Sequence, residues 1–523
     1  MKYKYIKLDN LDNGLNNLIN SVINYNELTI GQINDILKSD LHLSFCNDKC
    51  VIDAVDRISQ AKANKEKIFI AGDYDADGIC ATTIIKDSLD KYGVESGYYI
   101  PNRFTEGYGL NSERVNQAYQ KGYSLIITVD NGVKANDAIN KAKSLGMDVI
   151  VSDHHQIEEN VNADILVHPD YMDDRFEGLC GAGVALQISR KLIGNDEFHT
   201  TLACIATIGD MMSLFKENRT IVKHGLKILN THKYTIFDVL IDSNNKVITS
   251  SDIAFKLVPK LNAMGRLQEL GNPNDIIRYY FLSNDIKEKI IMKDNIININ
   301  KQRQYLSKKM YEKAITLMEN EPFIIIESED FHEGIVGLVA GKLSNTFNKP
   351  TIVFNNNNGI LKGSGRSIKG FDLYGFLSEG FNELINFGGH SQAVGLSLDY
   401  NDYLKFKNKV LKKYKDISVK DIKDIAYLIS ENSLFIDDVL ELDYLEPYGQ
   451  GLKMPEFAIT DLKVKDFNIL KNKYPKYKFN NFEAISFNEN IVAIENPKLI
   501  IGSISINDFR GKQVISMNIK DIE

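Results

Sequence analysis

Short apolar runs alternate with helical segments in the first third of the chain. These runs are rich in β-branched residues and occupy positions 68–71, 125–129, 149–151 and 165–167. Strands that are apolar at every position are covered on both faces, as in a parallel sheet between two layers of helices. The pattern therefore predicts that the first domain is α/β.

The later parts of the chain follow other patterns. Residues 284–320 contain no Gly or Pro and many charged side chains, which predicts a long helix linking two lobes. Apolar runs at 323–326 and 351–354 predict a second, smaller α/β unit, and short strands and turns after about Ile425 indicate a small β-barrel. We therefore expect an N-terminal extension at 1–50, the α/β domain at 51–283, the linking helix at 284–320, the second α/β domain at 321–424 and the barrel at 425–523.

The bulk composition of the 523 residues is typical of a cytoplasmic protein. No apolar run is long enough to span a membrane, and residues 1–10 lack the apolar core of a secretion signal. The five cysteines are scattered and odd in number, which fits a reducing compartment better than a disulfide framework. The formal net charge of −8 argues against coating nucleic acid through overall positive charge, so any such affinity must be local.

Three carboxylates directly follow the first predicted strand. The segment AGDYDADG places Asp73, Asp75 and Asp77 at alternate positions, where they repel one another unless a cation lies between them. A calcium-binding EF-hand loop begins with the same spacing. However, its twelfth position would be Ile84, where a bidentate Glu is required, and a strand precedes the segment instead of a helix. The sequence therefore favours a metal site of another kind.

The other predicted strands end in similar chemistry. Asp130 follows the second run, Asp153, His154 and His155 follow the third, and Asp210 follows an apolar helix-like segment. Ligands bind at the carboxyl ends of strands in open α/β sheets, so these groups are expected to converge. Any one of them alone would be read as a helix cap or turn residue, and for His168 and Asp170 that alternative stays open. Carboxylates with one or two imidazoles suit a pair of Mn²⁺ or Mg²⁺ ions and phosphodiester hydrolysis.

These motifs together resemble the DHH phosphoesterase family, whose signature is Asp153-His154-His155. AGDYDADG, the segment at 129–132 and Gly209-Asp210 match its other motifs in order. The variant AGDYDADG and the segment at 261–266 resemble the RecJ-type single-stranded-DNA-specific exonucleases in particular. The segments at 334–337, 363–367 and 387–390 resemble the DHH-associated domain, so the resemblance spans about residues 50–460.

The resemblance implies roles for individual residues. It implies as metal ligands Asp73, Asp75, Asp77, Asp130, His154 and Asp210. His155 and Asp153 would serve catalysis, and His390 would face the scissile phosphate. It implies as the site for a 5′-terminal phosphate Arg266, Ser364 and Arg366 with Gly388 and Gly389. Arginine offers a bidentate fork to phosphate, and glycines let backbone amides approach one.

The C-terminal region interleaves cations and aromatic residues. Lys473, Lys476, Tyr477 and Phe479 suit a face on which bases stack while lysines follow phosphates, and the resemblance implies an OB-fold here. A solvated, lysine-rich hairpin explains the same composition equally well.

The function implied is 5′-to-3′ exonucleolytic digestion of single-stranded DNA in repair and recombination, with Mn²⁺ or Mg²⁺ in a two-metal site. A single-stranded-DNA-binding protein and a helicase are the expected partners, without a membrane, and the chain is expected to be a monomer. One alternative is a phosphodiesterase of short oligonucleotides or cyclic dinucleotides, which would not need the third domain. Another is a non-catalytic replication scaffold, which is disfavoured because every expected acidic and histidine position is filled.

Overall fold

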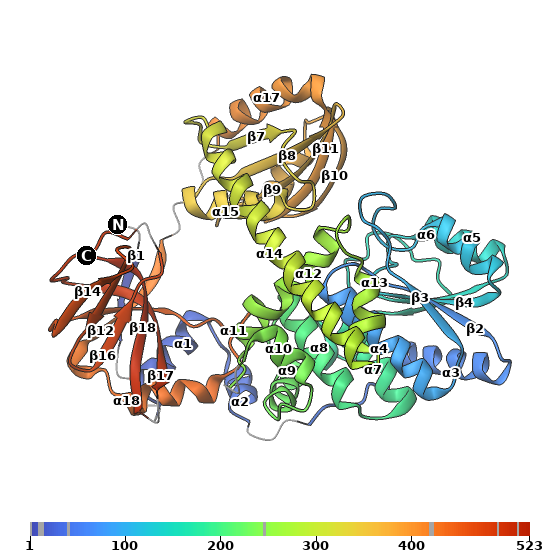
Figure 1. The fold of residues 1–523 in the computed structure, drawn as a ribbon, viewed down its shortest axis with the longest axis horizontal. Helices are drawn as coiled ribbons and strands as arrows, with labels where there is room; N and C mark the ends of the chain where they lie inside the picture. Colours follow the sequence, from blue (N-terminus) through green and yellow to red (C-terminus); the bar gives the residue numbers. More distant parts are fainter. Residues whose placement is uncertain are drawn as a thin grey trace. The chain divides into compact units, whose positions relative to one another are not determined.

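The computed structural model divides into two compact units (Figure 1). It describes residues 3–8, 15–38, 42–243, 247–417, 423–488, 491–509 and 512–523. The first unit combines Met1–Val258 with Lys423–Glu523, and the second is Pro259–Ile422. Within the described residues, no helix is both long and apolar enough to cross a membrane.

A five-stranded parallel sheet forms the centre of the first unit, as predicted. Its order is β3 (Ser96–Tyr99), β2 (Lys67–Ala71), β4 (Tyr123–Val129), β5 (Asp148–Ser152) and β6 (Ile165–Val167). The four apolar runs are all strands. The sequence did not predict β3, because this edge strand is only half-buried and lacks an apolar run.

Helices cover both faces of this sheet, so its strands are apolar on both sides. The layers are built from α3 (Lys49–Ala63), α4 (Ala76–Tyr92), α5 (Ser112–Gln120), α6 (Asn136–Ser144) and α7 (Gly181–Ile193). The next helices are α8 (Glu197–Gly209), which packs on α4 and α7, α9 (Lys216–Leu229), which packs on α8, α10 (Thr235–Ile241) and α11 (Ser250–Asp252). On one face, Val115 of α5 and Ile139 of α6 pack with Ile126 and Val149. On the other, α4 and α7 contact the strands and each other.

The second unit begins at the second residue of α12 (Val258–Arg266) and continues with α13 (Pro273–Asp275) and the predicted long helix, α14 (Ile286–Leu317). Its sheet has the order β10 (Leu384–His390), β11 (Ala393–Asp399), β9 (Ile360–Arg366), β8 (Thr351–Asn357) and β7 (Ile324–Ser328). Only β7 and β8 pair in parallel. The remaining helices are α15 (Val336–Phe347), α16 (Leu373–Ser378) and α17 (Tyr403–Lys415).

The C-terminal domain, residues 423–523, is an eight-stranded sheet that includes the chain's first strand. Its order is β1 (Tyr3–Lys7), β12 (Asp424–Ser430), β13 (Glu456–Thr460), β17 (Ile500–Phe509), β18 (Lys512–Ile522), β16 (Phe482–Ile485), β15 (Tyr474–Lys478) and β14 (Asp466–Leu470). The short helix α18 (Ile436–Leu440) also belongs to it. Thus β1 pairs in parallel with β12, across more than 400 residues of sequence.

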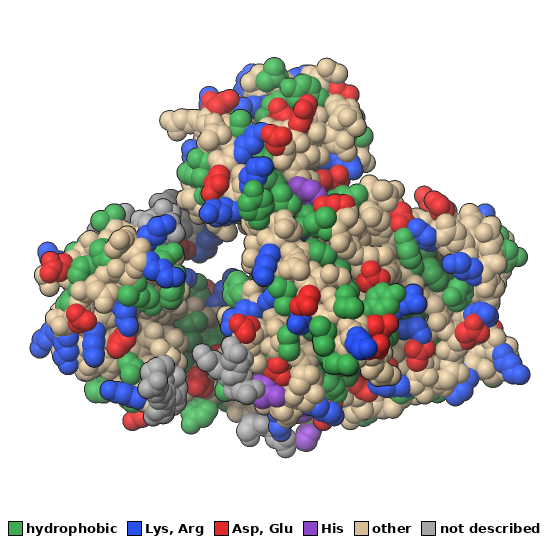
Figure 2. All heavy atoms as spheres, in the orientation of Figure 1, with side chains coloured by type: hydrophobic (Ala, Val, Ile, Leu, Met, Phe, Trp, Pro, Cys, Tyr) green, Lys and Arg blue, Asp and Glu red, His purple; other side chains and the backbone are tan. Residues whose placement is uncertain are grey.

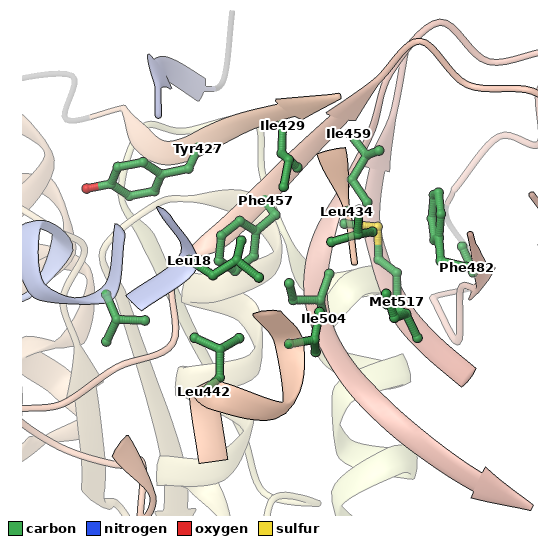
Figure 3. Close-up of a cluster of buried hydrophobic side chains, with 14 of the residues drawn as sticks. Leu18, Tyr427, Ile429, Leu434, Leu442, Phe457, Ile459, Phe482, Ile504 and Met517 are labelled. Carbon is green, nitrogen blue, oxygen red and sulfur yellow. The ribbon is translucent and has the colours of Figure 1, made fainter. Parts of the chain in front are cut away.

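Two N-terminal helices also pack on the C-terminal domain. Leu18 and Val22 of α1 (Asn17–Tyr25) and Ile36 of α2 (Ile30–Leu37) belong to the same buried cluster as Phe457. Figure 3 shows Leu18 beside Phe457. The N-terminal segment is therefore an integral part of the C-terminal domain, which the sequence pattern did not predict.

Truncating Leu18 should destabilise the C-terminal domain, because it leaves a cavity in this shared core. We expect Leu18→Ala to lower the free energy of unfolding by about 2–5 kcal/mol, measured by urea denaturation followed by circular dichroism. Ile30→Ala is the matched control, since the Ile30 side chain is 79% exposed. Equal stability of the two variants would contradict this packing.

Candidate active site

Acidic and histidine side chains from three strand ends and one helix end meet at the carboxyl edge of the parallel sheet. One ligand atom from each residue lies within 4.8 Å of the others in three overlapping groups: Asp73, Asp75 and Asp130; Asp77, His154 and Asp210; and Asp130, His154 and His155. The structure thus brings together all six residues expected to bind metal.

His154 lies at the centre of this cluster. Its Nε2 atom is 3.1 Å from Oδ1 of Asp130, 3.6 Å from Oδ2 of Asp210 and 3.7 Å from Oδ2 of Asp77. The carboxylates come from different elements. Asp77 lies in the first turn of α4, Asp130 follows β4 with φ of 60°, and Asp210 ends α8.

The carboxylates lie close to one another, with Asp73, Asp77 and Asp130 buried and Asp75 and Asp210 partly buried, which disfavours their charged forms. Burial, reinforced by the neighbouring carboxylates, holds the pKa of Asp73 and of Asp130 well above the usual range. The same causes raise the pKa of Asp75, and they raise the pKa of Asp210 to about 8. A bound cation would reverse this effect, since it favours the ionised form.

The donor set fits a divalent cation. Within the described part of the chain, Oδ1 of Asp73 and Oδ1 of Asp130 are buried and accept no hydrogen bond. Buried oxygens without a donor are costly unless they are neutralised or coordinated. Carboxylate oxygens with one imidazole match the preferences of Mn²⁺ and Mg²⁺, and the cluster contains no thiolate of the kind that structural zinc favours.

Helix N-termini hold two of the carboxylates in place. Oδ1 of Asp75 accepts hydrogen bonds from the amides of Asp77 and Gly78 and caps α4. The two oxygens of Asp77 accept from the amides of Gly181 and Ala182, the first residues of α7, both at 2.7 Å. The sequence reading missed this role of α7, for which the glycines at positions 181 and 183 were the only signal.

Gly181 is required for a second reason. A β-carbon added to it would lie 2.5 Å from the β-carbon of Asp130 and 2.6 Å from its Oδ1 atom. The start of α7 can therefore approach the cluster only without a side chain at this position.

Asp153 lies beside the cluster and orients His155. Its Oδ1 atom accepts from the backbone amide of His154 and lies 2.8 Å from Nδ1 of His155, and its Oδ2 atom accepts from the amide of Val133. Burial alone would raise the pKa of Asp153, but the bond from His155 holds it below the ordinary value. Burial would lower the pKa of His155, and the bond to Asp153 overrides this and raises it to about 9.

Two further residues hold the His155 segment. His168 is buried, accepts at Nδ1 from the amide of Asp170, and therefore donates from Nε2 to the His155 carbonyl at 3.0 Å. Tyr108, which the sequence reading did not single out, donates to the Asp130 carbonyl and lies with its ring edge toward His155.

Arg366, Ser364 and Gly337 lie close together within the second unit. Arg366 donates to Oγ of Ser364 at 2.8 Å, and a β-carbon on Gly337 would lie 3.1 Å from both side chains. Gly337 is in the first turn of α15, and a helix N-terminus attracts anions. Burial lowers the pKa of Arg366. Arg266 donates to the carbonyl of Gly334, two residues before α15 begins, at 3.4 Å.

The predicted glycines of the second unit's edge strand have different environments. Gly388, Gly389 and His390 are all exposed at the end of β10. A β-carbon on Gly389, whose φ is 139°, would lie 2.3 Å from the Ala393 carbonyl oxygen, so hairpin geometry requires this glycine. Gly388 has open space around it.

The expected base-stacking role of Tyr477 and Phe479 is wrong. Tyr477 is fully buried and Phe479 is 2% exposed, and both belong to the core of the C-terminal domain. Their rings pack against each other, Tyr477 also packs against Phe467, and Phe479 also packs against Phe482, so these rings are not open to a nucleobase. Lys473 is exposed, and Lys476 is half-buried and pairs with Glu483 at 3.3 Å.

Comparisons with known proteins match all three regions. The N-terminal domain of the DHH family matches residues 67–209, the DHHA1 domain residues 320–417 and the RecJ OB domain residues 425–521. The chain is 33% identical to the single-stranded-DNA-specific exonuclease RecJ of Bacillus subtilis, over 90% of this chain and 63% of that protein. It is 30% identical to the same exonuclease of Escherichia coli, over 68% of this chain and 67% of that protein.

A solved structure shares the fold of the whole chain. The crystal structure of RecJ in complex with Mn²⁺ from Thermus thermophilus superposes with a TM-score of 0.86 at 23% identity. The superposition covers 100% of this chain and 79% of that one.

Removing one buried carboxylate charge should stabilise the metal-free protein. We expect Asp130→Asn to melt higher than the wild type in EDTA, by about 2–4 °C for each kcal/mol of relieved repulsion. Mn²⁺ should raise the melting temperature of the wild type but not that of the variant, as followed by calorimetry. Glu113→Gln, at an exposed position on α5, is the control. A metal-free Asp130→Asn protein that melts below the wild type would contradict the repulsion, and full stabilisation by Mn²⁺ would contradict the ligand role.

Proposed function

The chain belongs to the RecJ family of single-stranded-DNA-specific exonucleases within the DHH family, and from this premise we propose that the cluster around His154 is its catalytic centre. The enzyme is a hydrolase that digests single-stranded DNA in the 5′-to-3′ direction, with Mn²⁺ or Mg²⁺ as cofactor. One observation supports the proposal above all: carboxylates from separate elements converge, and two of their buried oxygens accept no hydrogen bond within the described residues, an arrangement that a divalent cation would neutralise.

The proposed ligands are the six residues Asp73, Asp75, Asp77, Asp130, His154 and Asp210. When bound, divalent ions neutralise these carboxylates and act as Lewis acids on water and phosphate. Among these six, Asp77 has both oxygens engaged by α7 amides, which leaves a lone pair on each oxygen for coordination.

His155 is the proposed catalytic residue that acts on protons or phosphate. Its side chain is 42% exposed at the edge of the cluster, and the bond to Asp153 stabilises the protonated ring. An imidazolium in this position can contact a phosphate oxygen or donate to the leaving oxygen. Asp153 acts through His155, so we propose that it is a positioning residue.

The cluster of Arg366, Ser364 and Gly337 is the proposed site for the 5′-terminal phosphate. A terminal phosphate carries up to two charges and can accept more charge-assisted hydrogen bonds than an internal diester. Half-buried Arg366 and the N-terminus of α15 offer such bonds. We assign Arg266, Gly388, Gly389 and His390 to the same strand end on the family resemblance.

A groove in the C-terminal domain replaces Tyr477 and Phe479 as the proposed strand-binding surface. Phe435, Lys478, Asn480 and Lys512 line it, and Phe479, which also borders it, is only 2% exposed. The accessible ring is that of Phe435, whose side chain is 58% exposed. An exposed ring between lysines suits base stacking and phosphate contact. Figure 2 shows basic and acidic side chains interspersed over the face in view, in keeping with a DNA affinity that is local.

The C-terminal domain favours a DNA polymer over the short-substrate alternative. A phosphodiesterase of dinucleotides would need the catalytic cluster but no RecJ OB domain, which this chain has at residues 425–521. We propose that the enzyme acts in the cytoplasm in DNA repair and recombination, as a monomer, with a single-stranded-DNA-binding protein and a helicase as partners.

Digestion of end-labelled strands tests the function. The purified protein should release nucleotides from 5′-phosphorylated single strands in Mn²⁺, spare duplexes, and lose activity in EDTA. His155→Gln should lower turnover at least 100-fold and melt nearly as the wild type does, because His155 is partly exposed. Activity that persists after prolonged dialysis against chelator would contradict the metal-dependent mechanism.

End recognition and strand holding should be separable. Arg366→Ala should abolish the preference for 5′-phosphorylated over 5′-hydroxyl strands. Phe435→Ala with Lys512→Ala should raise the KM of a 30-nucleotide strand about 10-fold, since each lost base stack costs about 1–3 kcal/mol, and leave the end preference intact. Phe487→Ala is the control, because this 67% exposed ring lies outside the groove. If the two variants showed the same preference for 5′-phosphorylated strands and the same dependence of KM on strand length, end recognition and strand holding would not be separable.

A further inference from the structure

A turn of the C-terminal domain contacts the segment that follows Asp210. This turn, residues 445–452, follows the last helical turn before β13. It contains an isolated antiparallel bridge between Gly449 and Leu452. The carbonyl oxygens of Leu445, Glu446, Pro447, Tyr448 and Gln450 in this turn all accept hydrogen bonds from residues between 213 and 251. Because five carbonyl oxygens of the turn accept these hydrogen bonds, the turn is held in a fixed position against residues 214–250.

Arg219 supplies most of these bonds. Its side chain is buried, and it donates to the carbonyls of Leu445 at 2.9 Å, Glu446 at 2.7 Å and Pro447 at 3.3 Å. A buried guanidinium forms stronger hydrogen bonds than a neutral donor, and its removal would leave three acceptors without it. Ser250 donates to the carbonyl of Tyr448 at 2.8 Å.

The segment between Asp210 and α9 has an unfavourable backbone conformation at its first residue, Met211, and at Lys216, the first residue of α9. Met211 and Lys216 have φ of 56° and 53°, a conformation that non-glycine residues rarely adopt. Between them, the amide of Leu214 donates to the carbonyl of Gln450 at 2.8 Å. A β-carbon on Gly449 would lie 2.6 Å from Cδ1 of Leu214, so the turn is packed directly against this segment.

We propose that the 445–452 turn holds Asp210 in the geometry that binds metal, and that Arg219 is a positioning residue for the reaction. The proposal rests on the proposed role of Asp210 as a ligand. Asp210 is the last residue before this segment, and its side chain is 33% exposed, so the cluster itself constrains it less than its buried neighbours. The C-terminal domain then contributes to hydrolysis as well as to strand binding.

A short substrate separates these two contributions. A 5′-phosphorylated dinucleotide has one scissile bond and few bases to stack, so under the proposed division of roles its hydrolysis reports on the catalytic centre rather than on the Phe435 groove. A domain that only binds the strand affects KM for long strands, whereas a domain that positions Asp210 affects metal binding and turnover on every substrate.

The experiment compares Arg219→Met and Gly449→Ala with the wild type in the full-length protein. Mn²⁺ affinity without DNA is measured by electron paramagnetic resonance, and turnover is measured on the dinucleotide. We expect both variants to bind Mn²⁺ at least 5-fold more weakly and to lose at least 10-fold in dinucleotide turnover. Lys520→Met, which removes an ion pair between the exposed Lys520 and Glu456 in the same domain, is the control and should match the wild type.

A double-mutant cycle with Asp210→Asn distinguishes positioning from general destabilisation. If Arg219 acts through Asp210, adding Arg219→Met to Asp210→Asn causes little further loss of Mn²⁺ affinity, whereas independent effects add. Additive losses, or folded variants with wild-type Mn²⁺ affinity and dinucleotide turnover, would overturn the proposal. If Arg219→Met does not fold, the same measurements of Mn²⁺ affinity and dinucleotide turnover, alone and combined with Asp210→Asn, are made on Gly449→Ala and Ser250→Ala. A single Asp210→Asn variant that binds Mn²⁺ as the wild type does would instead refute the ligand role of Asp210.

Discussion

Repulsion between buried carboxylates is the constraint on which the architecture of the first unit depends. Asp73, Asp77 and Asp130 are each at most 3% exposed, and two of their oxygens accept no hydrogen bond within the described residues. Isolated ionised groups in such a place would neutralise themselves by taking up protons. The fold nevertheless gathers them from separate elements, which is stable in the charged form only when a cation lies between them.

The backbone around the cluster compensates part of this charge. The N-termini of α4 and α7 direct amides at Asp75 and Asp77, and a helix N-terminus carries roughly half a positive charge. Asp130 has a left-handed backbone conformation, which for a non-glycine residue costs roughly 1–3 kcal/mol. Strain of this kind is retained only where the surrounding contacts fix it, and here the amide of Asp130 donates to the Ser152 carbonyl while its own carbonyl accepts from Tyr108. The partial charges of two helices cannot balance the whole cluster, so the need for metal remains.

The sequence could predict the parts of this arrangement that depend on local pattern. Apolar runs locate β2, β4, β5 and β6, and the residues that follow three of these strands form the cluster together with Asp210 at the end of α8. Burial of Tyr477 and Phe479 was not predictable from composition, because an aromatic residue beside lysines is equally typical of an alternating strand whose apolar face forms a core. The roles of His168 and Arg219 depend on contacts with backbone carbonyls, which leave no signature in the sequence.

The C-terminal domain cannot complete its core without residues from the beginning of the chain. Its sheet includes β1, and its core includes Leu18 and Val22, so residues from both ends of the chain must be present before the core closes. A second contact joins the domain to α9, where the buried guanidinium of Arg219 donates hydrogen bonds to the carbonyls of Leu445 and Glu446 in the 445–452 turn. Residues 423–523 alone would therefore expose the edge of β12 and part of their core, which favours aggregation over folding. A domain bound in this way at two places is not a freely tethered module, and under the proposal above its 445–452 turn also supports the segment that follows Asp210.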